Sequence, residues 1–203
     1  MDKRAIAMVA AGLAGVAALS LPSAASASAQ GTAQGTKELR LRAGLTLRIP
    51  TAWKVYKVDK DWTRVVTGAC PTAGTSRFGF RDSGCRSFWV MGPEAIKVGH
   101  EHFDAYTPDE PFYPASDVGP CPYDKKLWLG QMTLADKGLA QVGRGHKAHY
   151  RAWSARCVSP TSHKNKGRRF TQREWFLPTS KILFVDQWKT PGLPAILRKA
   201  TWS

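Results

Sequence analysis

Apolar and polar residues alternate along much of the first half of the chain, and this period of two predicts β-strands rather than helices. The alternation is clearest in residues 38–42 and 45–49, which a turn at Ala43-Gly44 would join as a hairpin. Further runs rich in β-branched and aromatic residues predict strands at residues 53–58, 62–67 and 88–91.

The second half has one dominant stretch, residues 146–188. Its pattern predicts three consecutive strands of one antiparallel sheet, separated by a basic loop and a short turn. Residues 182–185 form the most apolar run, which predicts an interior strand. Upstream, residues 127–134 predict a short strand, whereas residues 136–141 are ambiguous. We therefore expect this stretch to be the scaffold of the domain.

Between the two halves lies an irregular segment, residues 99–124, which holds five prolines. Such a segment cannot be a helix or a central strand. A long loop in a compact domain is usually functional or packed by its own side chains, here by its Phe and Tyr residues. Residues 191–200 predict a closing helix. The expected fold class is α+β, a single domain with a mostly antiparallel sheet, one or two packed helices and a long Pro-rich loop.

The N-terminus resembles an export signal. A short charged start precedes an apolar run at residues 5–21, and small residues before Gln30 fit an A-x-A cleavage pattern. We expect residues 1–29 to be a signal peptide, residues 30–37 a flexible lead-in and residues 38–203 a disulfide-bonded domain. The alternative is an uncleaved anchor, but the run is short and mostly alanine. The chain is therefore expected to be secreted, either extracellular or associated with the cell wall, with no transmembrane segment in the mature chain.

All four cysteines lie beyond the expected signal peptide: Cys70, Cys85, Cys121 and Cys157. An even number in an exported chain predicts two disulfides. Of the three pairings, we favour Cys70 with Cys85 and Cys121 with Cys157, because Cys70 and Cys85 would face each other where two predicted strands flank one loop.

The chain carries 30 Lys and Arg against 15 Asp and Glu, a formal net charge of +15. A surface this basic favours anionic partners, such as an anionic polymer or a cell-wall component, although solubility alone is an equal explanation. The loop after the first strand of the scaffold concentrates cations, and Trp153 and Trp175 nearby would either stack on a ligand or lie in the core. The predicted anion-binding residues are Lys164, Lys166, Arg168 and Arg169; the alternative is a solvated hairpin tip.

Candidate catalytic chemistry is sparse. His100 and His102 alternate on a segment expected to be extended, so with Asp104 they could supply metal ligands. The alternative is two surface loop histidines. Glu174 and Asp186 lie on neighbouring predicted strands and could form an acid–base pair, but such residues more often pair with nearby cations. No G-x-S-x-G or C-x-x-C pattern occurs, no specific nucleic-acid motif is present, and we expect no cofactor.

Four phrases carry a resemblance: LRIPTAWKVYKV, CRSFWVMGPEAIKVG, PFYPASDVGPC and REWFLPTSKILFVDQW. They are similar to a group of small exported actinobacterial proteins, a likeness that implies no activity. More distantly, a P-x-x-W phrase at residues 50–53, a G-x-K-A-x-Y hairpin phrase at residues 145–150 and a closing helix resemble the PsbP-like α/β/α sandwich. That resemblance implies a sheet with packed helices and no functional residue.

Two functions are compatible with the sequence. The first is a secreted, non-enzymatic protein that binds an anionic cell-surface or extracellular partner through a basic face. The second is a secreted metal-dependent or hydrolytic enzyme that uses His100 and His102. We favour the first, and the oligomeric state stays open.

Overall fold

The computed structural model describes residues 35–76 and 78–203. The predicted signal peptide and most of the predicted lead-in lie outside the described residues. The first strand, β1 (Thr36–Arg40), begins slightly before the expected start of the domain at residue 38. Among the described residues, no helix has the length and apolar character needed to cross a bilayer.

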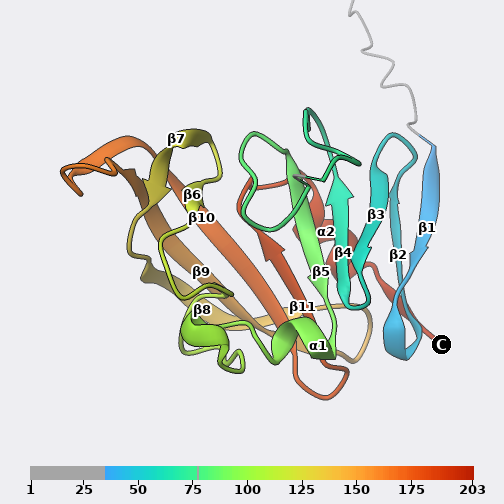
Figure 1. Cartoon of the computed structure of the whole chain (residues 1–203). Helices are drawn as coiled ribbons and strands as arrows, with labels where there is room; N and C mark the ends of the chain where they lie inside the picture. Colours follow the sequence, from blue (N-terminus) through green and yellow to red (C-terminus); the bar gives the residue numbers. More distant parts are fainter. Residues whose placement is uncertain (1–34, 77) are drawn as a thin grey trace, which may run out of the picture. The chain divides into compact units, whose positions relative to one another are not determined.

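The larger of two sheets has nine strands, and every strand pairing in it is antiparallel. Figure 1 shows its order, β3-β4-β5-β11-β10-β9-β7-β6, with β8 alongside β9. The strands are β3 (Lys54–Asp59), β4 (Trp62–Val66), β5 (Ser87–Met91), β6 (Pro120–Cys121), β7 (Asp124–Leu129), β8 (Thr133–Gln141), β9 (Lys147–Val158), β10 (Asn165–Leu177) and β11 (Ile182–Asp186).

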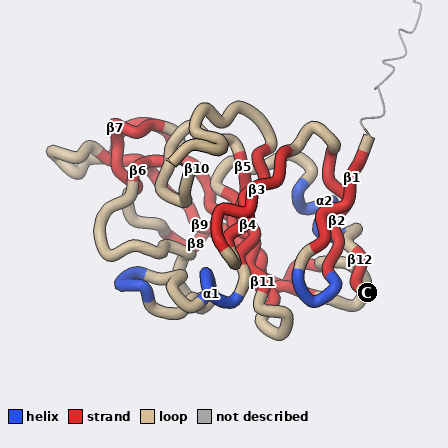
Figure 2. Tube along the Cα trace, turned by 45° about the vertical axis from the view of Figure 1, so that its right-hand side comes forward, coloured by secondary structure: helices blue, strands red, loops and turns tan. Residues whose placement is uncertain are grey.

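The predicted hairpin near the N-terminus forms a second, three-stranded sheet. Its β1 and β2 (Leu45–Pro50) are joined by β12 (Thr201–Trp202), which pairs with β2. The helical elements are short: α1 (Pro93–Ile96), α2 (Leu193–Arg198) and the 3-10 turns Arg42–Gly44 and Glu101–Phe103. The fold is thus a mostly antiparallel β protein with two short helices. The closing helix was expected over residues 191–200, but α2 covers only Leu193–Arg198. Figure 2 shows how little helix accompanies the strands.

The main core lies between the two sheets. Leu45, Leu47 and Ile49 alternate along β2, and their side chains are fully buried against one face of the large sheet. Phe184 of β11 and Leu193 of α2 belong to the same apolar cluster. Because this hairpin must cover the large sheet to bury its leucines, the chain forms two layers rather than one continuous sheet.

The other face of the large sheet is covered by the irregular segment at residues 99–119, called the strap below. Its Tyr106 and Phe112 are buried against Trp89, Leu183 and Val185. Every residue of β5 and β11 is therefore buried, which confirms the prediction of an interior strand at residues 182–185. The expected irregular segment ends earlier than residue 124, because β6 and the start of β7 occupy its last residues.

Candidate basic-tip site

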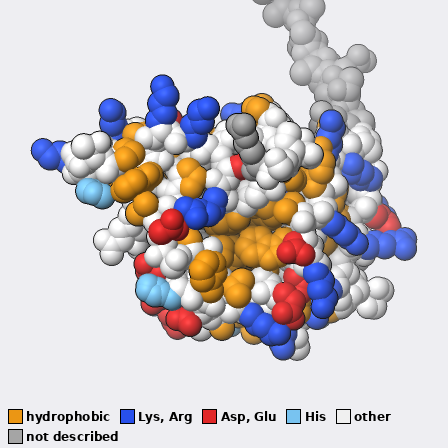
Figure 3. All heavy atoms as spheres, in the orientation of Figure 1, with side chains coloured by type: hydrophobic (Ala, Val, Ile, Leu, Met, Phe, Trp, Pro, Cys, Tyr) orange, Lys and Arg blue, Asp and Glu red, His pale blue; other side chains and the backbone are white. Residues whose placement is uncertain are grey.

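The four predicted anion-binding residues lie together at one end of the large sheet. Lys164 is the last residue of the loop between β9 and β10. Lys166, Arg168 and Arg169 are near the start of β10. All four side chains are exposed. In Figure 3, Lys and Arg side chains gather at the upper left, over the end of the sheet where this hairpin projects.

None of these four cations forms an ion pair with a carboxylate in the described part of the chain. One of them is braced by an aromatic ring, since the Arg168 guanidinium lies 4.3 Å from the centre of the Tyr123 ring. The rings of Trp128 and His163 lie 5.5 Å apart and pack the loop against β7. The four charges thus have no carboxylate partner, and aromatic contacts pack the hairpin that carries them against its neighbours.

Two further exposed lysines, Lys125 and Lys126, come from β7. Val158 of β9 pairs with Trp128 on one side and with Asn165 on the other, so β7 and the start of β10 flank the same end of β9. No local sequence pattern assigns these two lysines to the site, because only the strand pairing brings them near residues 164–169. We call the set Lys125, Lys126, Lys164, Lys166, Arg168 and Arg169 the basic tip.

Both favoured disulfides are present. Cys121 of β6 is joined to Cys157 of β9, which ties the end of the strap to the base of the basic tip. Cys70 is joined to Cys85 and closes the loop between β4 and β5. Trp153 and Trp175 are buried at 4% and 3% exposure, which supports the core interpretation and leaves no open stacking face on either.

The two histidines differ sharply in their surroundings. They lie around a 3-10 turn instead of an extended run, because His102 takes a positive φ of 61°. His100 is buried, and its Nε2 lies 3.1 Å from the Thr107 carbonyl oxygen and 3.2 Å from the Thr107 nitrogen. His102 is exposed. No cluster of three or more potential metal ligands among the described residues includes either histidine, and Asp104 is equally outside such a cluster.

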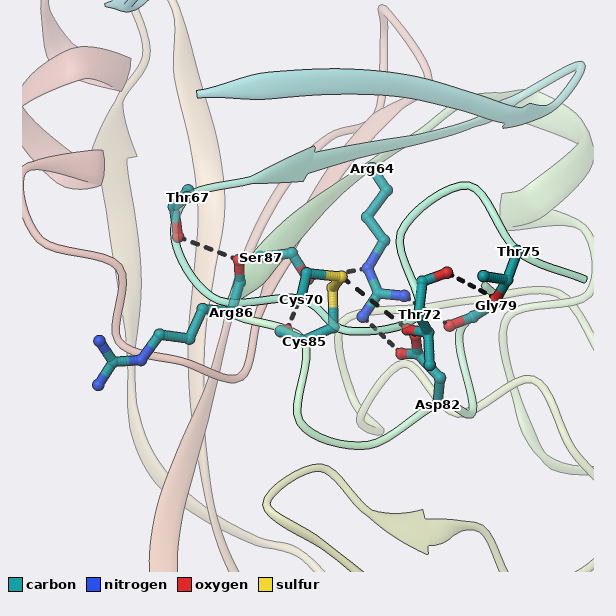
Figure 4. The surroundings of a disulfide bond; sticks show 10 residues. All are labelled: Arg64, Thr67, Cys70, Thr72, Thr75, Gly79, Asp82, Cys85, Arg86 and Ser87. Carbon is teal, nitrogen blue, oxygen red and sulfur yellow. Dashed lines mark hydrogen bonds and ion pairs between the residues drawn. A yellow bond between two sulfur atoms is a disulfide. The ribbon is translucent and has the colours of Figure 1, made fainter. Parts of the chain in front are cut away.

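A single cluster of potential metal ligands occurs in the described residues: Cys70, Asp82 and Cys85. Both sulfur atoms are used in a disulfide, so they cannot bind a metal as thiolates. Figure 4 shows that Asp82 instead points at Arg64, with 2.6 Å between carboxylate and guanidinium. Burial lowers the pKa of the Arg64 guanidinium, and the bond to Asp82 opposes that effect. This half-buried cluster braces the loop between β4 and β5.

Glu174 and Asp186 do not form a pair. Asp186 lies opposite Arg173 and Glu174 lies opposite Val185, so the two carboxylates point to opposite faces of the sheet. Asp186 forms an ion pair with Arg173, as such residues commonly do. Glu174 is fully buried without a cation, and burial raises the pKa of its carboxyl above the ordinary value, although its hydrogen bonds act in the other direction.

Comparison with known proteins gives no relative to add to this geometry: no protein-family model matches the chain, and neither the curated proteins nor the solved structures contain a significant match.

Proposed function

We propose that the protein is a secreted binding protein without enzymatic activity, and that the basic tip holds an anionic polymer of the cell surface or the extracellular medium. The observation that carries the proposal is the set of four exposed cations, Lys164 to Arg169, that have no carboxylate partner in the described residues. The two disulfides support the location, because such bonds persist in oxidising compartments.

The form of the tip favours a polymer over a small anion. Its charges project from two strands and a loop, where each can contact a different anionic group of an extended ligand. Contacts of this kind release counterions, so the affinity falls steeply with salt and depends little on the sequence of the polymer. The net charge of +15 adds long-range attraction to the encounter.

The test is retention on a heparin column and a Kd for heparin measured across salt concentrations. A tip variant carries Lys164→Gln, Lys166→Gln, Arg168→Gln and Arg169→Gln. The matched control variant loses the same charge from exposed positions elsewhere, Lys54, Lys57, Arg198 and Lys199. We expect the tip variant to elute at lower salt than the control, and its slope of log Kd against log salt to fall by about 3, since four contacts are lost.

Adding Lys125→Gln and Lys126→Gln should weaken binding further if β7 shares the site. The proposal fails if the native protein is not retained, or if the tip and control variants lose affinity equally. Equal loss would mean that the net charge alone, and not this cluster, attracts the polymer.

A further inference from the structure

A groove with a volume of about 710 Å³ opens between the strap and the turn that connects β7 to β8. Its apolar lining comes from Pro111 and Tyr113 of the strap, from Leu129 and Met132 at the turn, and from Trp153 of β9. The indole of Trp153 is fixed, because its Nε1 donates a hydrogen bond to Glu174 at 3.0 Å. The groove therefore has a preformed apolar floor. Its volume lies in the range that is usual for sites that bind organic ligands.

Carboxylates surround this floor. Glu101, Asp109, Glu110 and Asp117 line the groove, and no Lys, Arg or His stands among the described residues that line it. This is unusual in a chain with 30 basic and 15 acidic residues. Figure 3 shows acidic side chains at the lower left of the molecule, below the basic tip. The groove and the basic tip are thus opposite in charge.

Only part of this negative charge is compensated within the protein. Asp117 forms an ion pair with Arg81 at 3.2 Å, and Glu110 lies 3.9 Å from Nδ1 of His100. Glu101 and Asp109 form no ion pair within the described residues. All four side chains are exposed, so their charge can meet a ligand at the rim of the groove.

We propose that the groove binds a short basic peptide segment, with an apolar side chain against the half-buried Leu129 and Met132 and with Lys or Arg side chains at the carboxylate rim. The buried Trp153 supports this floor from below. Charge complementarity selects a cationic occupant, and the apolar floor selects one that also carries a hydrophobic group. Burial of apolar surface from both partners at the floor adds favourable free energy to that of the charge contacts at the rim.

The arrangement of the carboxylates argues against a metal ion as the occupant. No three of them converge, since the only cluster of potential ligands in the described residues is the one around the Cys70–Cys85 disulfide. Oxygen-coordinated metal ions need several oxygens at about 2.0–2.6 Å from one point. Charges spread along a rim match a ligand whose cations are also spread out, as in a peptide with several basic residues.

The experiment is isothermal titration of the whole protein with N-acetylated, C-amidated Lys-Leu-Lys. The rim variant is Asp109→Asn with Glu110→Gln, and the matched control is Glu38→Gln with Asp59→Asn, which removes the same charge from exposed positions on β1 and β3. We expect saturable binding that weakens at least tenfold in the rim variant and less than twofold in the control. The peptide Lys-Ser-Lys should bind about tenfold more weakly, and Glu-Leu-Glu should not bind.

Thermal unfolding of the rim variant checks that the fold is retained, and heparin retention should be unchanged in it, so that this site and the basic tip are tested separately. The proposal is overturned if Lys-Leu-Lys does not bind saturably, or if the rim and control variants bind it equally. It is also overturned if the peptide does not bind but the native protein self-associates in a way that the rim variant does not, because the occupant would then be a second copy of the chain.

Discussion

The carboxylate of Glu174 accepts a hydrogen bond of 2.8 Å from the hydroxyl of Tyr106, and this contact joins the middle of the large sheet to the strap. The same carboxylate accepts bonds from the backbone N–H of Phe112 at 2.8 Å and from the side chains of Trp153 and Gln172. Since four donors converge on one buried group, Glu174 fixes the strap and, through Trp153, the floor of the groove.

Replacing Glu174 by Ala should therefore lower the free energy of unfolding by at least about 3 kcal/mol. The change leaves three buried N–H donors without an acceptor and opens a cavity, and each unpaired donor alone costs about 1–3 kcal/mol. Urea unfolding followed by tryptophan fluorescence measures the loss. Glu38→Ala, at an exposed position on β1, is the control and should change the stability by less than about 0.5 kcal/mol. Similar values for both variants would mean that the Glu174 network contributes little.

The titration of Glu174 should also make stability depend on pH. Burial raises the pKa of this carboxyl in the folded state. A group with a raised folded pKa contributes stability below its unfolded pKa, and this contribution is lost as the pH rises through the folded pKa. Relative to Glu174→Gln, whose amide does not titrate, the native protein should lose stability as the pH is raised above 4.5, the ordinary glutamate value, over the range in which the protein stays folded.

Urea midpoints of the two proteins, measured across this range at constant ionic strength, give the difference directly. Tyr106 does not interfere, because burial raises the pKa of its hydroxyl and keeps it protonated. A native protein that instead gained stability over the variant with rising pH would show that the hydrogen bonds outweigh burial, and that the carboxyl pKa is lowered.

The sequence predicted the features of this fold that depend on neighbouring residues. The alternation of Leu45, Leu47 and Ile49 identified β2, and the apolar run at residues 182–185 identified β11. The cations at residues 164–169 could be predicted as one patch because they lie close together in the sequence of one hairpin. The Cys70–Cys85 pairing followed from the two strands that flank its loop.

Features that depend on pairing between distant residues were not predictable. Glu174 accepts hydrogen bonds from Tyr106 and Phe112, which precede it by 68 and 62 positions in the sequence. No local sequence pattern shows that these donors meet it. Lys126 joins the basic tip only through the pairing of β7 with β9. The groove combines Asp109 of the strap with Met132 and Trp153, each from a different element. The alternating spacing of His100 and His102 suggested a shared side, but the left-handed backbone at His102 breaks the extended geometry that this inference needs.

Removing either disulfide should destabilise the protein, and by comparable amounts. Cys70 and Cys85 close a loop of 15 residues, and Cys121 and Cys157 close one of 36. In the chain-entropy model these loops contribute about 3 and about 4 kcal/mol. The double variants to Ser are measured by urea unfolding. We expect only Cys121→Ser with Cys157→Ser to weaken heparin binding as well, because that bond lies at the base of the basic tip. If Cys70→Ser with Cys85→Ser also lowered the heparin affinity, the loss of affinity would reflect general destabilisation of the fold and not a change at the basic tip.

The turn before β9 provides a test of how the C-terminus is held. Gly143 has φ +72°, and a Cβ there would stand 2.7 Å from both the Ala200 carbonyl oxygen and Nε1 of Trp202. Gly74 has a similar φ of +76° but nothing within 4 Å of such a Cβ. Gly74→Ala should thus cost only the left-handed backbone conformation, about 1–2 kcal/mol.

Gly143→Ala should cost that amount plus the clash, which adds about 1–3 kcal/mol. The clash falls on a contact that matters, because Nε1 of Trp202 donates to the Val142 carbonyl at 2.9 Å and the Gly143 N–H donates to Leu197 of α2 at 2.9 Å. The two variants, compared by urea unfolding, separate backbone strain from packing. Hydrogen exchange should show faster opening of β12 in Gly143→Ala alone; equal exchange in both variants would mean that β12 does not depend on this turn.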